Sequence, residues 1–403
     1  MPALYKKWFY RGKLALIGKM LGKPQPKPIT FVGPGSAAQL SRAIAQFGIH
    51  KLLIVTDKPL RELGVLQSTL AALEASNVST QVYDGVLPDP TTAVVNDGIA
   101  MLKEHQCTGV LAFGGGSSID CAKVIALAGA NHCAAQDCVG ANKCTVPALP
   151  FFAIPTTAGT GSEGTCIAVI SDNTTHEKNG VIDTSMIPRA AALDPLLMQG
   201  LPAAITAATG MDALTHAIES YIGTFGNEET DLYGLAATKL VFQYLPTACA
   251  DGQNLEAREA MSLASYYGGL AITQALVGYV HAISHNLGAR YGVPHGLGNA
   301  MVLPHVLELL KVDAAPRMAR LAAHAGLGSS GEADSVLAQK LVDGVWALNR
   351  QIGIPQTCDA LRAEDIDSLV QAALDEGSSY PTPRFFDPGE CRTLLESLMT
   401  TSQ

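Results

Sequence analysis

The spacing of hydrophobic and polar positions changes near residue 197, which divides the chain into two parts. In the first part, short apolar runs alternate with stretches of helical spacing. The apolar runs have the uniform character of buried parallel strands and lie in KLLIVTD (51–57), GVLAFGGG (109–116) and LPFFAIPTTAG (149–159). Helical spacing is clearest over 36–48 and 93–107. Alternating strands and helices predict an α/β domain with a parallel sheet over residues 29–196.

Beyond residue 197 the strand pattern fades and alanine-rich helical spacing takes over. Short Gly or Pro breaks separate the expected helices. They cover residues 201–223, 231–249, 256–273 and 316–326. We therefore expect residues 197–403 to form an all-α domain.

Composition narrows the class of protein. The chain has 403 residues, which is long for one core and sufficient for two domains. With 48% hydrophobic and 16% charged residues, it is expected to bury large interiors. A net charge of -9 argues against nucleic acid as a partner.

The nine cysteines include no C-x-x-C pair, a pattern typical of reduced thiols in a cytoplasmic protein. Cys133, Cys138 and Cys144 lie closer together than the others. A metal site there is conceivable, but no zinc-site spacing is present, so we favour buried or loop thiols.

The first 28 residues form a basic N-terminal extension. They carry seven Lys or Arg and no acidic residue, mixed with aromatic and apolar residues. No run is long enough to span a membrane, and no signal-peptide pattern is present. An amphipathic helix on an anionic membrane surface is one interpretation. Packing on the acidic body of the protein or on a second subunit is favoured over it.

Three segments in the first part could bind a nucleotide. GGGSSIDCAK (114–123) follows a strand and opens a helix, so its glycines and free N–H groups could approach a phosphate, with Ser117 or Ser118 as the helix cap. PTTAGTGSE (155–163) places hydroxyls and glycines after another strand. Asp57 ends a strand, where a carboxylate can bind ribose hydroxyls and repel a 2′-phosphate. Each glycine-rich segment alone is equally explained by a turn, and for Asp57 alone a turn residue is the favoured interpretation.

Histidines gather in the second part. His281 and His285 are four residues apart, as are Asp212 and His216, so each pair shares one helix face. His295 follows a short break. If the two helices converge, Asp212, His216, His281 and His295 supply three nitrogens and one carboxylate oxygen, which suits Fe(II), Zn(II) or another divalent ion. A lone core histidine would need no metal, but this grouping favours one. His285, left beside the ion, could move protons.

At these residues the chain resembles the iron-containing (group III) alcohol dehydrogenases, a branch of the dehydroquinate-synthase-like fold. The resemblance covers about residues 29–400. It rests on four motifs in order, namely GGGSSIDCAK, PTTAGTGSE, GMDALTHAIES and HAISHNLGARYGVPHGLGNAMVLPH. Three features depart from the family pattern: the basic extension has no counterpart, Asn286 stands where proline is frequent, and the segment 162–181, which contains Lys178, fits the pattern loosely.

The resemblance implies an NAD-binding Rossmann-like domain over 29–196, a helical metal-binding domain over 197–403 and an active site in the cleft between them. It implies the four metal ligands named above, with His285 near the nicotinamide. The cofactor site would comprise Asp57, Gly115, Gly116, Ser117, Asp120, Thr156, Thr157, Thr160 and Lys178. It also implies a homodimer or larger homo-oligomer.

The resulting hypothesis is an NAD-dependent oxidoreductase that uses Fe(II), or Zn(II), on a small uncharged primary alcohol or aldehyde. The metal would act as a Lewis acid at the substrate oxygen. A glycerol-type polyol dehydrogenase is an alternative that sequence separates poorly. A lyase of the dehydroquinate synthase type would need several bases near the histidines, where Arg290 is the nearest. A binding protein without activity would be expected to have lost a ligand.

Overall fold

The computed structural model describes residues 25–174 and 177–400. The described residues form two compact units, one over residues 25–200 and one that begins at Leu201. Most of the basic extension lies outside the described residues.

A six-stranded sheet forms the centre of the first unit. All its pairings are parallel, in the order β1-β9-β6-β4-β2-β3. The strands are β1 (Ile29–Val32), β2 (Lys51–Val55), β3 (Ser79–Tyr83), β4 (Gly109–Gly114), β6 (Phe151–Pro155) and β9 (Ala190–Leu193). The strands expected from the three apolar runs are thus confirmed as β2, β4 and β6.

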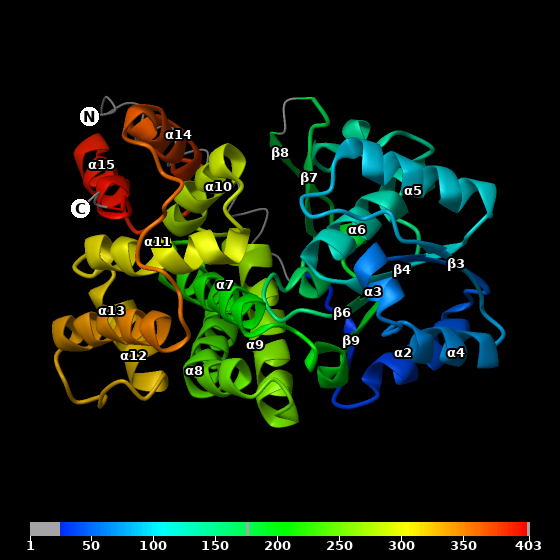
Figure 1. Ribbon diagram of the computed structural model, residues 1–403, viewed down its shortest axis with the longest axis horizontal. Helices are drawn as coiled ribbons and strands as arrows, with labels where there is room; N and C mark the ends of the chain where they lie inside the picture. Colours follow the sequence, from blue (N-terminus) through cyan, green and yellow to red (C-terminus); the bar gives the residue numbers. More distant parts are fainter. Residues whose placement is uncertain (1–24, 175–176, 401–403) are drawn as a thin grey trace. The chain divides into compact units, whose positions relative to one another are not determined.

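Both faces of this sheet are buried, because alternate residues of each apolar strand point to opposite sides. Leu53, Val110 and Phe151 pack into one core cluster, while their neighbours Leu52 and Leu111 pack into the other. Figure 1 shows helices on both faces. They are α5 (Thr92–Glu104) and α6 (Gly116–Asn131) on one side, and α2 (Ser36–Ile44) and α4 (Gln67–Ala75) on the other. The predicted α/β domain is confirmed.

A second, three-stranded sheet was not anticipated. It has the order β5-β8-β7, with β5 (Gly140–Ala141), β7 (Ile167–Ser171) and β8 (Lys178–Ile182). Its β7–β8 pairing is antiparallel, unlike every pairing of the large sheet. The remaining elements of this unit are η1 (Ala45–Phe47), α3 (Lys58–Glu62), η2 (Ala135–Cys138), η3 (Ser162–Gly164), η4 (Thr184–Met186) and η5 (Pro195–Met198).

Helices make up all the named elements of the second unit, which confirms the all-α prediction for the described residues after Leu201. Its central helix, α7 (Ala203–Ile222), is buried along most of its length. The others are α8 (Glu228–Ala250), α9 (Leu255–Ala275), α10 (Tyr279–Tyr291), α11 (His295–Leu310), α12 (Ala315–His324), α13 (Asp334–Gln351), η6 (Ala363–Asp365), α14 (Ile366–Gly377) and α15 (Pro388–Ser397).

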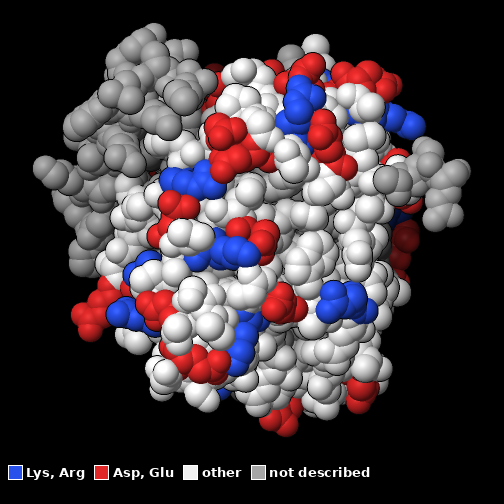
Figure 2. Space-filling model, turned by 90° about the vertical axis from the view of Figure 1, so that its left-hand side faces the viewer, with Lys and Arg blue, Asp and Glu red and all other residues white. Residues whose placement is uncertain are grey.

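Charges on the surface lie close to their opposites. On the face drawn in Figure 2, described Lys and Arg side chains lie beside Asp and Glu side chains. Arg384, for example, pairs with both Asp313 and Glu390. In the described part of the chain, no helix combines the length and apolar character needed to cross a membrane.

Candidate active site

The large sheet has a reversal of strand order between β2 and β4. From β2 the chain moves outward to β3, then returns past β2 to β4 and continues in the other direction through β6 to β9. Sheets of this kind bind ligands outside the carboxyl ends of the strands at such a reversal. Asp57 follows β2 and Gly115 follows β4, so both lie at this edge.

The two glycine-rich loops touch each other at the same edge. β4 and β6 are neighbours, and their loops begin side by side. A Cβ atom added at Gly116 would lie 2.5 Å from Thr160 Cγ2, and one at Gly115 would lie 3.3 Å from Thr157 Oγ1. Any side chain at residue 116 would therefore force the loops apart. The structure brings together two motifs that begin 41 positions apart in the sequence, at Gly114 and Pro155, and Thr156 is buried at their junction.

The N-terminus of α6 carries no side-chain cap. Gly115 is its N-cap residue, while Ser117 and Ser118 lie inside its first turn. The expectation that one of these serines caps the helix is wrong, because each has already entered helical geometry. The first-turn N–H groups are left without a capping side chain, as is typical of a helix end that receives a phosphate.

Asp120 and Lys123 fasten the second loop to α6. The Asp120 carboxylate accepts hydrogen bonds from Ser162 Oγ at 2.6 Å and from the Val169 N–H at 2.9 Å. Fully buried Lys123 donates to Ser162 Oγ, Thr165 Oγ1 and the Ile167 carbonyl at 2.7–2.8 Å. Burial lowers the pKa of Lys123 to about 8. Both residues support the loop from inside the protein.

The charged groups of two expected cofactor residues, Asp57 and Lys178, already interact with other groups of the protein. Asp57 is the N-cap of α3, where its carboxylate accepts from the Leu60 N–H at 2.9 Å. Lys178 begins β8 in the small sheet and pairs with Asp89 at 2.9 Å. Asp57 lies at the edge that carries the glycine loops, whereas the contacts of Lys178 connect it to the segment after β3.

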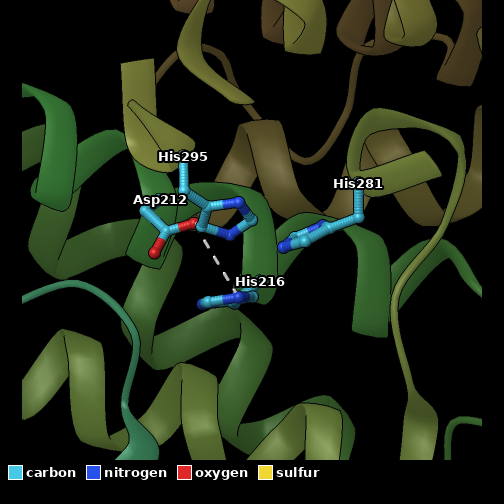
Figure 3. Close-up of side chains that lie close together, drawn as sticks. All are labelled: Asp212, His216, His281 and His295. Carbon is cyan, nitrogen blue, oxygen red and sulfur yellow. Dashed lines mark ion pairs between the residues drawn. The ribbon is translucent and has the colours of Figure 1, made fainter. Parts of the chain in front are cut away.

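In the second unit, the four expected metal ligands converge. Asp212 and His216 lie on α7, His281 on α10, and His295 is the first residue of α11. One potential ligand atom from each lies within 4.8 Å of the others. Figure 3 shows the carboxylate and the three imidazole rings gathered around one point. Three of the residues are buried, and the His295 side chain is 31% exposed, so the cluster has one accessible side.

The cluster holds more acceptors than donors. Asn299 Nδ2 lies 2.7 Å from Asp212 Oδ1 and 3.2 Å from both His281 Nε2 and His295 Nε2. An amide nitrogen has two hydrogens and cannot satisfy three acceptors fully. Because more acceptor lone pairs converge here than the Asn299 amide can satisfy, a cation would be favourable between them. The residues therefore fit a divalent ion with nitrogen and oxygen ligands.

The protonation states suit metal binding as well. Burial and the neighbouring imidazoles lower the pKa of His281 well below its usual value. Burial lowers the pKa of His295 to about 3, even though the Asp212 carboxylate opposes the shift. Burial alone would raise the pKa of Asp212, but the surrounding imidazoles and Asn299 bring it below its ordinary value. At neutral pH His281 and His295 are therefore neutral and Asp212 is ionised, the forms that bind metals.

The buried carboxylate of Glu219 orients the imidazole ring of His281. Its Oε2 lies 2.6 Å from His281 Nδ1, and its two oxygens accept from the N–H groups of Gly278 and Val280 at 2.8 and 2.7 Å. With Nδ1 engaged, Nε2 carries the lone pair that faces the cluster. A Cβ atom at residue 278 would lie 2.8 Å from Glu219 Oε1, so this contact needs glycine. Burial raises the pKa of Glu219 to about 7, against the opposing effect of the two N–H bonds.

His285 lies beside the cluster with a carboxylate partner of its own. Its Nδ1 is 2.6 Å from Glu376 Oε1 on α14, and its ring stacks on His295 with centroids 5.2 Å apart. Tyr380 and Asn286 donate to the same carboxylate at 2.8 and 3.1 Å. The residue that departs from the family pattern, Asn286, thus helps to hold the partner of His285.

The charged and amide groups at the centre of these networks, Lys123, Glu219, Asn299 and Glu376, were absent from the predicted site residues. Helical spacing could have identified Glu219, which lies three residues after His216 and seven after Asp212, on the same face of α7. Asn299, four residues after His295, carried the same signal. Glu376 lies 91 residues from His285, and nothing in the local sequence connects the two.

Comparison with known proteins agrees with this arrangement. Residues 27–195 match the family described as iron-containing alcohol dehydrogenase, and residues 206–399 match its C-terminal part. The chain is 38% identical to alcohol dehydrogenase 4 of Schizosaccharomyces pombe over 91% of this chain and 86% of that protein. It is 36% identical to the NAD-dependent methanol dehydrogenase of Bacillus methanolicus over 89% and 94% of the two chains.

A solved 1,3-propanediol oxidoreductase superimposes with a TM-score of 0.90 and 36% identity, over 93% of this chain and 99% of the other. Fold and site define an oxidoreductase of two units, one with a Rossmann-like sheet and one helical. The chain belongs to the iron-containing alcohol dehydrogenase family. The resemblance seen in the four sequence motifs is confirmed.

Replacing Glu219 with glutamine tests the role of its carboxylate. The amide would bring N–H groups toward the Gly278 and Val280 donors, so His281 would lose its fixed orientation. We expect the affinity for a divalent ion to fall about 10–100-fold, as for other losses of a partner behind a ligand. Competition with a chelator measures this change, with exposed Glu228→Gln as the control. Equal affinity in both variants would mean that Glu219 has only a structural role.

Proposed function

We propose that this protein is a metal-dependent oxidoreductase that transfers hydride between NAD(H) and a small uncharged alcohol or aldehyde. The observation that carries the proposal is the convergence of Asp212, His216, His281 and His295 into an acceptor-rich cluster. The relatives named above act on methanol or 1,3-propanediol according to their names, which supports small alcohols as substrates.

We assign the four cluster residues as ligands of Fe(II), with Zn(II) as the alternative. When bound, such an ion supplies a Lewis acid that lowers the cost of removing the alcohol proton. The donor set of three imidazoles and one carboxylate accommodates either metal. Asp212 provides the negative charge, and Glu219 and Asn299 hold the ligands in position.

The cofactor would bind at the edge formed by β2, β4 and β6. Its pyrophosphate would lie against the open N-terminus of α6, with Asp57 on the ribose of adenosine. Direct contact is proposed for Asp57, Gly115, Gly116, Ser117, Thr156, Thr157 and Thr160. Asp120 and Lys178 belong to the proposed cofactor site through the resemblance, but their charged atoms already have protein partners.

His285 would be the proton-carrying group. Glu376 engages its Nδ1, so Nε2 is the nitrogen available to give or take a proton. Glu376 in turn is held by Tyr380, which keeps the imidazole in one orientation.

A lyase acting on a phosphorylated acid is disfavoured by the charges nearby. Arg290, the nearest base in sequence to the histidines, is paired with Asp365, which also accepts from Tyr291 at 2.6 Å. The homodimer, the cytoplasmic location and the contacts of the N-terminal extension stay predictions.

The first test is formation of NADH from a panel of primary alcohols, diols and glycerol. Protein stripped by a chelator would be reloaded without oxygen with Fe(II) or Zn(II). We expect turnover that depends on the metal, and the panel shows whether simple alcohols or polyols are preferred.

Replacing His281 with alanine removes a proposed metal ligand. Its metal affinity should fall by more than the roughly 10–100-fold expected for the loss of a residue that only orients a ligand. Exposed His324→Ala is the control and should behave as wild type. Normal metal content and turnover in His281→Ala would contradict the proposal.

Replacing Asp57 with glycine tests the ribose contact. Glycine is a tolerated N-cap, so α3 should lose only a few tenths of a kcal/mol. Removing the carboxylate removes its repulsion of a 2′-phosphate, and we expect the kcat/KM ratio of NADP to NAD to rise about tenfold or more, roughly 1.4 kcal/mol. Asp84→Gly, after the neighbouring strand β3, is the control. An unchanged ratio would mean that Asp57 only caps the helix.

Replacing His285 with glutamine tests the proton path. An amide of similar size cannot carry a proton at neutral pH, so kcat should fall about 10²–10⁴-fold while NAD affinity and metal content are retained. Steady-state rates across pH, with metal analysis of each preparation, measure this effect. A variant with wild-type kcat and pH profile would exclude His285 from proton transfer.

A further inference from the structure

Three thiols of the first unit meet at a point that the proposed function does not use. Cys133 follows the C-cap of α6, Cys138 ends η2, and Cys144 lies shortly after β5. The Sγ atom of Cys138 is 3.6 Å from that of Cys133 and 3.4 Å from that of Cys144. All three sulfurs lie within 4.8 Å of one another. We call these residues the thiol triad.

These separations match the edges of a metal–thiolate polyhedron. With a metal–sulfur distance of about 2.3 Å, trigonal or tetrahedral geometry places neighbouring sulfurs about 3.8–4.0 Å apart. The Cys133–Cys138 and Cys138–Cys144 Sγ distances, 3.6 and 3.4 Å, are shorter than this by a few tenths of an ångström. In the sequence a metal site at these cysteines was only the less favoured interpretation, because no zinc-site spacing is present; their convergence arises from three different segments of the fold.

We propose that the thiol triad binds a thiophilic metal ion, Zn(II) or Cu(I), through three thiolates. Thiolate ligands select these soft or borderline ions. The group contains no fourth His, Cys, Asp or Glu among residues 25–174 and 177–400. Cu(I) is satisfied by three sulfurs, and Zn(II) would take its fourth ligand from solvent, since Cys133 and Cys144 are only partly buried. This proposal does not depend on the proposed enzymatic function.

The backbone around the triad is held in place by polar side chains. Asn131 accepts from the N–H groups of Thr145 and Val146 at 3.2 and 2.9 Å, and donates to the Val146 carbonyl at 2.7 Å. These bonds fasten the segment after Cys144 to the last turn of α6. Asn96 of α5 accepts from the Ala135 N–H at 2.9 Å, which fixes the start of η2. The sulfur positions are therefore preorganised, which lowers the entropy cost of binding an ion.

A disulfide is the competing interpretation of close thiols. It would bring two sulfurs to about 2.05 Å and leave the third without a role, whereas Cys138 here has two nearly equivalent neighbours. A metal ion would displace the thiol protons to solvent as it binds.

The consequence of binding would be local stability. The cofactor loop Gly115–Ser117 lies at the opposite end of α6, whose 16 residues span about 24 Å. An ion at the thiol triad therefore cannot touch a nucleotide there. It would tie η2 and the segment after β5 to the end of α6, and raise the melting temperature of the protein by stabilising the folded state.

The test is spectroscopic, with reduced, chelator-treated full-length protein titrated without oxygen with Cu(I) or with Cd(II) as the probe for Zn(II). Sulfur ligands give ultraviolet charge-transfer absorption, which the histidines and carboxylate of the other cluster cannot produce. We expect the absorption to saturate at one ion per chain. Retention of Cu(I) would indicate a copper site. Displacement of bound Cd(II) by Zn(II) would indicate a zinc site.

Cys138→Ser should abolish the absorption and weaken binding by more than about a hundredfold, since it removes a ligand rather than a supporting group. Cys249→Ser, a partly buried cysteine of α8, is the matched control and should bind as wild type. Cys144→Ser is the second variant if Cys138→Ser does not fold. Both Cys138→Ser and Cys249→Ser should keep wild-type affinity for NAD.

Two results would overturn the proposal. One is no charge-transfer absorption with either ion, or absorption that persists in both Cys138→Ser and Cys144→Ser. The other is a disulfide: of the nine cysteines, a disulfide would remove two and leave seven reactive thiols in denatured protein prepared without reductant. Nine reactive thiols together with the expected titration would support the metal site.

Discussion

The buried carboxylate of Glu219 is the interaction on which the candidate metal cluster depends. It joins α7 to the start of α10 by accepting two backbone N–H groups and the His281 Nδ1 proton. A buried carboxylate is costly unless such donors satisfy it. Because the donors belong to Gly278, Val280 and His281, at the beginning of α10, they fix where that helix starts. His281 and, one turn later, His285 are thereby directed to the same side as Asp212 and His216.

The same principle, a buried polar group that must find partners, organises the first unit. Lys123 has no access to solvent and has three acceptors: Ser162 near the end of the second glycine-rich loop, and Thr165 and Ile167 just after it. That loop lies against Gly115 and Gly116 because Lys123 and Asp120 of α6 form hydrogen bonds with its Ser162. In the proposed cofactor site, the part of the motifs nearest to the nucleotide would therefore be glycine and hydroxyl, while the charged part is structural. The sequence alone does not show which motif residues would contact a ligand and which support the loop; their contacts in the fold show this.

Sequence reasoning succeeded where chemistry follows helix or strand periodicity. The apolar runs at 51–57, 109–116 and 149–159 became three adjacent parallel strands, and the pairs Asp212–His216 and His281–His285 lie on helices as expected. It failed where the outcome depends on geometry at the residue level. Ser117 or Ser118 was expected to cap α6, but the helix begins at Gly116, before either serine, and its N-cap residue is Gly115. The antiparallel β7–β8 pair was missed because its segment carries a weak alternation between apolar and polar positions.

The sequence by itself determined the two kinds of unit, the residue types that could bind a metal and the loops that could receive a phosphate. Such properties depend on composition and on spacing within one element, which the chain order states directly. Only the tertiary structure decided that three helices converge on one acceptor-rich point, that Glu376 partners His285 and that three separate cysteines meet. Those contacts join residues far apart in the chain, and their distances are set by how side chains fill the space between packed elements.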